Sequence, residues 1–132
     1  MRKILLGVLL VAAAGATPAA DIAEGKAAPA MELKLLDGSR YVLAEQAGKV
    51  TVINFWATWC GPCIAELPNV KKVYAAHHDQ GFEVIGISLE NADLKPEDTP
   101  EVIAGKHARA RQKLLDFTQS NGIPWPQHYD GK

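Results

Sequence analysis

The residues best suited to chemistry are the chain's two cysteines, Cys60 and Cys63, which are separated by Gly61 and Pro62. Two cysteines can form one disulfide or one redox-active dithiol, but neither a disulfide-rich scaffold nor a four-cysteine zinc site. If they lie in a first helical turn, the free N–H groups and partial positive charge of that turn stabilise a thiolate on Cys60. We therefore expect Cys60 to be the exposed attacking thiol and Cys63 to be the more buried resolving thiol.

Local patterns place this pair between a strand and a helix. The run from Val50 to Trp56 is rich in β-branched and aromatic residues, which predicts a buried central strand. Pro62 suits a first helical turn, and apolar residues then recur at helical spacing, with a kink expected at Pro68. A second apolar run, Phe82 to Leu89, predicts another buried strand. The order strand, helix, strand predicts a right-handed parallel βαβ unit.

Three further segments complete the predicted domain. Residues 31–43 alternate in polarity around an Asp-Gly pair, which predicts a β-hairpin. Thr99 and Pro100 look like an N-cap and the first position of a helix that runs to about Ser120. Residues 123–132 look turn-like, because Pro126 cannot donate to a sheet ladder. The stretch 91–112 looks like an insertion into the domain, and the sequence assigns it no function.

The N-terminus has the layout of a secretory signal peptide over residues 1–19, with two basic residues, an apolar run and then small residues. The apolar run is shorter than the roughly 20 residues of a spanning helix. We therefore expect no stable membrane insertion after cleavage, although an uncleaved anchor is the alternative. Residues 20–30 are expected to be a flexible lead-in and residues 31–132 the folded domain. The expected location is extracytoplasmic, most simply the periplasm, where disulfides can form.

The composition of the chain limits the kinds of partner and cofactor that we expect. The chain has 132 residues, enough for one domain, and its 48% hydrophobic content excludes wholesale disorder. A net charge of −1 gives no electrostatic reason to bind nucleic acid. The four histidines show no ligand spacing to the cysteine pair, so no metal site is expected. The expected redox group is the Cys60–Cys63 disulfide, with no other cofactor.

The segment NFWATWCGPC, residues 54–63, followed by Glu66 and Pro68, resembles the thioredoxin superfamily and specifically its extracytoplasmic TlpA/ResA-like branch. The predicted hairpin, GISL and GIPWPQHYDG resemble the same branch, so the resemblance extends from about residue 29 to the last residue. Asn54 stands where ordinary thioredoxin has a buried aspartate. The resemblance implies an α/β thioredoxin-like fold with an N-terminal β-hairpin.

The resemblance also implies an enzyme, a thiol-disulfide oxidoreductase with protein disulfides as substrates. The Gly61-Pro62 dipeptide resembles that of reducing thioredoxins, whose potential is about −270 mV. We therefore expect a reductant that a membrane thiol donor recharges, with cytochrome c maturation as the suggested pathway. Trp59, together with Gly61 and Pro62, is expected to contact the substrate.

Glu66 matches a glutamate of the resembled branch. Three residues after Cys63 on a helix, it shares a face with that cysteine. A partly buried carboxylate there could exchange protons with the Cys63 thiol. The alternative is an ordinary solvated glutamate.

Family members carry a cis-proline loop, two antiparallel strands and a last helix after the WPQ-type loop. We expect this chain to lack those last strands and that helix, which would leave an open edge on the strand at residues 50–56. Gly122-Ile123-Pro124 as the cis-proline loop is the alternative interpretation. Two other functions stay open, a peroxiredoxin-like redoxin and a non-enzymatic metal-binding chaperone. Against the first, the proline that precedes a peroxidatic cysteine is missing around Thr58.

Overall fold

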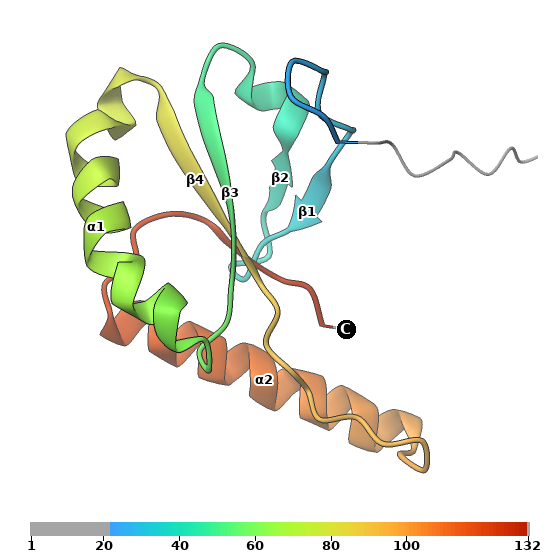
Figure 1. Cartoon of the computed structure of the whole chain (residues 1–132). Helices are drawn as coiled ribbons and strands as arrows, with labels where there is room; N and C mark the ends of the chain where they lie inside the picture. The colour runs from blue at the N-terminus through green and yellow to red at the C-terminus, as the bar shows by residue number, and fades with distance from the viewer. Residues whose placement is uncertain (1–21, 132) are drawn as a thin grey trace, which may run out of the picture.

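The computed structural model describes residues 22–131, so the predicted signal peptide lies outside the described part of the chain. Within these residues, five strands and two α-helices form in the order β1 (Glu32–Lys34), β2 (Arg40–Val42), β3 (Val50–Trp56), α1 (Gly61–His77), β4 (Phe82–Ser88), α2 (Pro100–Ser120) and β5 (Gln127–Tyr129). Short 3-10 turns follow β2 at Leu43–Gln46 and α1 at His78–Gln80. Figure 1 shows α1 and the β1–β2 hairpin on opposite sides of the β3–β4 pair.

The central sheet has the order β3-β4-β5 and is parallel throughout. Val50 pairs with Phe82 and Trp56 with Ser88, so β3 and β4 are in register over their full lengths. The connection between them is α1, which confirms the predicted parallel βαβ unit. The carboxyl ends of the strands therefore lie at the same end of the sheet, where the chain continues from β3 into the cysteine motif.

The middle strand β4 is covered on both faces by apolar side chains. Successive residues of a strand face opposite sides, and on β4 both Val84 and Ile85 are fully buried. Val84 packs in a cluster with Leu67 and Tyr74 of α1. Ile85 packs with Tyr41 of the predicted hairpin, which forms as an antiparallel pair. The mixed α/β fold with an N-terminal hairpin is as the sequence predicts.

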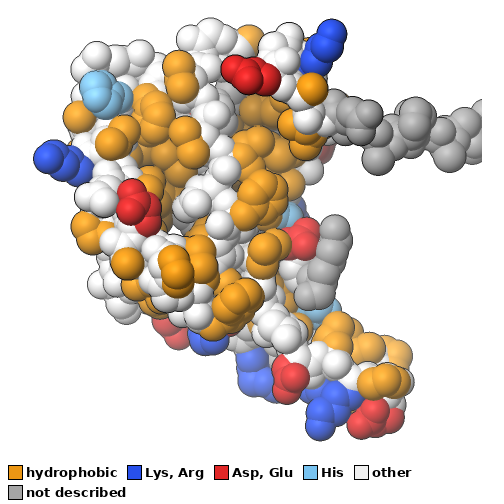
Figure 2. All heavy atoms as spheres, viewed as in Figure 1, with side chains coloured by type: hydrophobic (Ala, Val, Ile, Leu, Met, Phe, Trp, Pro, Cys, Tyr) orange, Lys and Arg blue, Asp and Glu red, His pale blue; other side chains and the backbone are white. Residues whose placement is uncertain are grey.

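The position of β3 matches the open edge expected for residues 50–56, but not the buried central strand that its apolar run predicts on its own. Among the described residues, β3 pairs only with β4 and forms an edge of the sheet. Its side chains are consequently accessible: Val50 is 67% exposed and Phe55 is 60% exposed. Figure 2 shows hydrophobic side chains gathered on this face of the molecule. The apolar run predicts a strand correctly but overstates its burial, because burial depends on a second neighbour that local sequence does not specify.

The segment after α2 also corrects the sequence analysis. Residues expected to be turn-like form β5, which runs parallel to β4. Pro126 is compatible with this strand because it lies just before β5 and contributes only its carbonyl, which accepts from Gly86 N at 2.9 Å. No described peptide bond is cis, so Gly122-Ile123-Pro124 does not form a cis-proline loop here.

The second helix begins as predicted. Thr99 is the N-cap of α2, its Oγ1 accepts from Val102 N at 3.4 Å, and Pro100 follows in the first turn. The C-terminal half of α2 contributes Leu114, fully buried, to the cluster around Trp56. Its N-terminal half extends beyond the sheet, as Figure 1 shows.

Candidate active site

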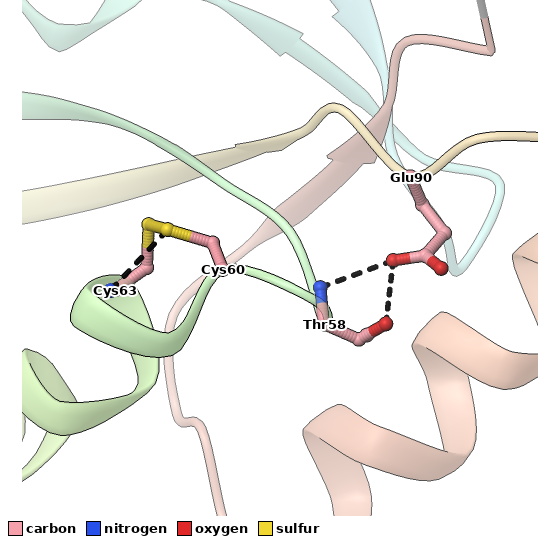
Figure 3. The surroundings of a disulfide bond; sticks show 4 residues. All are labelled: Thr58, Cys60, Cys63 and Glu90. Atoms are coloured by element: carbon pink, nitrogen blue, oxygen red, sulfur yellow. Dashed lines mark hydrogen bonds between the residues drawn. A yellow bond between two sulfur atoms is a disulfide. The ribbon is translucent and has the colours of Figure 1, made fainter.

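The cysteine pair lies at the start of α1 and forms a disulfide. Cys60 is the N-cap residue, with φ −84° and ψ 93°, and its Sγ accepts a hydrogen bond from Cys63 N at 3.3 Å. Figure 3 shows this contact and the two side chains folded over the first helical turn. The sulfur of Cys60 thus occupies the position where a helix N-terminus offers an unsatisfied N–H group and partial positive charge.

The short loop between β3 and α1 is anchored by buried residues and holds Cys60 at this position. Trp56, the last residue of β3, is 2% exposed, and its Nε1 donates to Gln127 Oε1 at 2.9 Å. Ala57 is also buried, and its carbonyl accepts from Cys60 N at 3.1 Å. The chain therefore passes from the last residue of β3 to the first residue of α1 through only four residues, 57–60. Pro62 lies in the first turn of α1, where its missing N–H leaves no helical bond unmade.

The surface around the disulfide is accessible on one side. Trp59 is 64% exposed, and Gly61 and Pro62 are exposed as well. Both cysteines are partly buried, and Cys63 packs against the core cluster that contains Trp56. The residues predicted to contact a substrate therefore lie beside the disulfide on the solvent side.

Glu66 differs from its predicted environment. It lies on α1 as expected, but it is exposed rather than partly buried. Its Oε2 accepts a hydrogen bond from Asn69 Nδ2 at 3.2 Å. This is the environment of a solvated helix glutamate, the alternative that the sequence left open. Proton exchange with Cys63 stays a prediction.

A buried carboxylate that sequence analysis did not identify lies behind the cysteine loop. Glu90, two residues after β4, is 2% exposed. Its Oε2 accepts from Thr58 N at 3.0 Å and from Thr58 Oγ1 at 2.7 Å, and its Oε1 pairs with Lys113 Nζ of α2. Burial raises the pKa of Glu90, but the hydrogen bonds from Lys113 and Thr58 outweigh it and hold that pKa below its ordinary value. Glu90 is therefore a carboxylate at neutral pH.

One signal in the sequence could have pointed to Glu90. Glu90 is a charged residue directly after the apolar run Phe82 to Leu89, at the carboxyl end of a predicted parallel strand, where functional residues collect. Its partners could not be found in the same way, since Thr58 is 32 residues before it and Lys113 is 23 residues after it.

The described residues contain no group of three or more His, Cys, Asp or Glu side chains placed to hold a metal ion. Within residues 22–131, no helix has the length and apolar character needed to cross a membrane.

A disulfide at the N-cap of the helix in a parallel βαβ unit, on a sheet flanked by a hairpin, defines a thioredoxin-like domain with a CxxC site. Residues 23–130 match the redoxin family. The match spans most of the chain, and the protein belongs to this family.

Its relatives carry the names of disulfide enzymes. The chain is 40% identical over 74 residues to the thiol-disulfide oxidoreductase ResA of Oceanobacillus iheyensis, covering 53% of this chain and 38% of the relative. It is 34% identical over 108 residues to the ResA of Geobacillus thermodenitrificans, covering 76% and 62%. Among solved structures, the thioredoxin domain of a thiol-disulfide oxidoreductase from Bacteroides vulgatus superimposes with a TM-score of 0.53 at 28% identity, covering 83% of this chain and 65% of that one. The chain thus spans less than two thirds of the length of these relatives.

Proposed function

We propose that this protein is an extracytoplasmic thiol-disulfide oxidoreductase that reduces disulfides of protein substrates. The observation that carries the proposal is the position of Cys60, at the N-cap of α1 with its sulfur on Cys63 N. This geometry favours the thiolate form of Cys60 once the disulfide is reduced. The names of the ResA relatives support the same chemistry, and the N-terminal sequence pattern supports the location.

The reaction follows from the two sulfurs. The Cys60 thiolate attacks one sulfur of the substrate disulfide, which forms a mixed disulfide and releases the other substrate sulfur as a thiolate. The Cys63 thiol then gives its proton to solvent water and, as a thiolate, attacks Cys60 Sγ. This step forms the Cys60–Cys63 disulfide and releases the second substrate thiolate, so two electrons pass from the protein to the substrate. The dithiol itself is the redox group, and a thiol donor at the membrane restores it.

The surroundings of the disulfide suit a protein substrate. Trp59 and the exposed Gly61-Pro62 pair form an accessible surface beside Cys60, on which an extended peptide can lie against the indole ring. Disulfides of apocytochrome c are the substrate that the TlpA/ResA-like resemblance suggests. The Gly61-Pro62 dipeptide supports a reducing rather than an oxidising potential.

A redox titration tests the proposal. The full chain is equilibrated with dithiothreitol buffers, its thiols are trapped by alkylation, and the oxidised fraction is measured by mass. We expect a potential near the thioredoxin value of about −270 mV, displaced from that of a short Cys-Gly-Pro-Cys peptide. A potential equal to the peptide's would show that the fold does not influence the pair and would contradict the proposal.

A further inference from the structure

Glu90 is the most deeply buried carboxylate of the described chain, and each of its oxygens has a separate partner. Oε2 accepts both hydrogen bonds from Thr58, and Oε1 pairs with Lys113 of α2. Figure 3 shows Thr58 between the carboxylate and the disulfide. The carboxylate therefore connects the loop that precedes Cys60 to the second helix.

The position of Thr58 makes this connection relevant to Cys60. Thr58 lies inside the turn closed by the hydrogen bond from Cys60 N to Ala57 O. The backbone N–H of Thr58 has Glu90 as its acceptor, so the turn is held from the sheet side by a charge-assisted hydrogen bond. Without this acceptor, the Thr58 N–H would lie partly buried and unpaired, which favours rearrangement of the turn.

We propose that Glu90 is a positioning residue for Cys60: by holding Thr58 it keeps the Cys60 sulfur at the N-cap of α1, and Lys113 balances its charge. The inference rests on the proposed function, because it concerns the same thiol. The other groups that face Glu90 are consistent with this role. Tyr129 of β5 is close enough for the Glu90 charge to contribute to its raised pKa, and Arg111 acts on the same tyrosine in the opposite direction.

The positioning role of Glu90 and the direct effect of its charge shift the pKa of Cys60 in opposite directions, which makes the inference testable. The negative charge of Glu90 disfavours a nearby thiolate, so removing the charge alone lowers the pKa of Cys60. Loss of the connection to Thr58 moves the Cys60 sulfur away from the helix N-terminus, so it raises the pKa of Cys60. The direction of the shift therefore separates the two roles.

The two oxygens of Glu90 allow these roles to be removed separately. Glu90→Gln keeps the acceptor for Thr58 and replaces the oxygen that faces Lys113, whose side chain is 59% exposed and free to turn into solvent. Glu90→Ala removes both contacts. A matched control is Asp98→Ala, because Asp98 also forms a shielded ion pair with α2, at 2.6 Å from Lys106, and its other hydrogen bond is from Lys95 N rather than from the cysteine loop.

The measurement is the rate of iodoacetamide alkylation of Cys60 against pH, on the reduced full chain, with thermal unfolding recorded for every variant. We expect Glu90→Ala to raise the apparent pKa of Cys60 by about 1 unit, which lowers the alkylation rate below that pKa about tenfold. Glu90→Gln should leave the Cys60 pKa unchanged or lower it by no more than about 0.3 units, since the neutral amide still accepts from Thr58 and only the charge is lost. Asp98→Ala should leave the pKa unchanged even where it lowers the melting temperature.

Three results would overturn the inference. A lowered Cys60 pKa in Glu90→Ala would show that charge, not position, is the contribution of Glu90. An equal rise in Asp98→Ala would show a general effect of destabilisation, and an equal rise in Glu90→Gln would assign the effect to the ion pair with Lys113. If Glu90→Ala does not fold, Thr58→Val removes the hydroxyl donor, which makes the shorter of the two hydrogen bonds to Glu90, while preserving the shape of the side chain. The absence of any shift in the Cys60 pKa of that variant counts against the inference. A wild-type Cys60 that titrates like a free thiol, at about 8.5, would instead contradict the proposed function.

Discussion

At the scale of single residues, the two cysteines have different expected roles, and variants can separate them. Cys63→Ser removes the resolving thiol but leaves Cys60 at the N-cap of α1. We expect this variant to accumulate one stable mixed disulfide per chain when mixed with a peptide disulfide, because no second sulfur can displace the peptide. Mass spectrometry under non-reducing conditions measures the adduct.

Cys60→Ser is the matched control, since it retains one thiol at the other position. We expect little or no adduct from it, because Cys63 packs against the core and lacks the N-cap position. Adducts of equal yield from both variants would show that either cysteine can attack. The proposed order of the two steps would then be wrong.

The cysteine pair and its exposed neighbours could be predicted because their chemistry depends on local features: spacing of three residues, a preceding strand and a proline in the first turn. Glu66 was predicted from the same local spacing, yet it points to solvent and contacts Asn69. Glu90 could not be assigned a role from sequence. Its environment is created by two segments distant in the chain, and only the fold brings them together.

At the scale of elements, the pairing of β4 with β5 depends on a glycine. Gly86 is buried on β4, and a Cβ added there would lie 2.1 Å from Gln127 Oε1. That oxygen accepts the hydrogen bond from Trp56 Nε1, so a Gly86→Ala substitution must displace the amide and leave the indole N–H unpaired. We expect a loss of about 1–3 kcal/mol in the free energy of unfolding, measured by urea denaturation.

Gly105→Ala is a control that should change the free energy of unfolding in the opposite direction. Gly105 lies inside α2, where an added Cβ meets only Arg109 Nη1, at an ordinary 3.5 Å. Alanine should stabilise this helix by about 0.5–1 kcal/mol. If both variants lose stability equally, the close packing of Gln127 on Gly86 is not the reason for the glycine in β4.

The elements α2, β5 and β3 show which features local sequence patterns can predict and which they cannot. The first turn of α2 is encoded locally by Thr99 and Pro100, and both residues act as predicted. The sequence does not predict β5, because proline disfavours a sheet ladder and only the structure shows that Pro126 lies just outside it. The apolar run of β3 specifies a strand but not the number of its neighbours, so the run alone overstates burial, whereas the open edge expected for residues 50–56 is present.

At the scale of the whole molecule, three apolar clusters hold the described fold together, and each contains one of the three tyrosines. Tyr129 lies in the cluster of Trp56 and α2, Tyr74 in the cluster between α1 and β4, and Tyr41 in the cluster under the hairpin. All three side chains are buried. The ionisation of the tyrosines therefore reports on the packing of each cluster separately.

The tyrosines should resist ionisation while the molecule is folded. Burial raises the pKa of Tyr41 and of Tyr129, and burial together with the charge of Glu83 raises the pKa of Tyr74 to about 12. Above pH 10 the unfolded chain loses phenolic protons that the folded chain retains, so the free energy of unfolding falls as the pH rises towards the folded pKa values.

We expect absorbance at 295 nm to show little tyrosinate at pH 10 in native buffer. In denaturant, about half of the tyrosines should be ionised at that pH. Tyr74→Phe should remove the last step of the native titration, and a tyrosine that ionises near pH 10 without denaturant would show that its cluster is not packed as described.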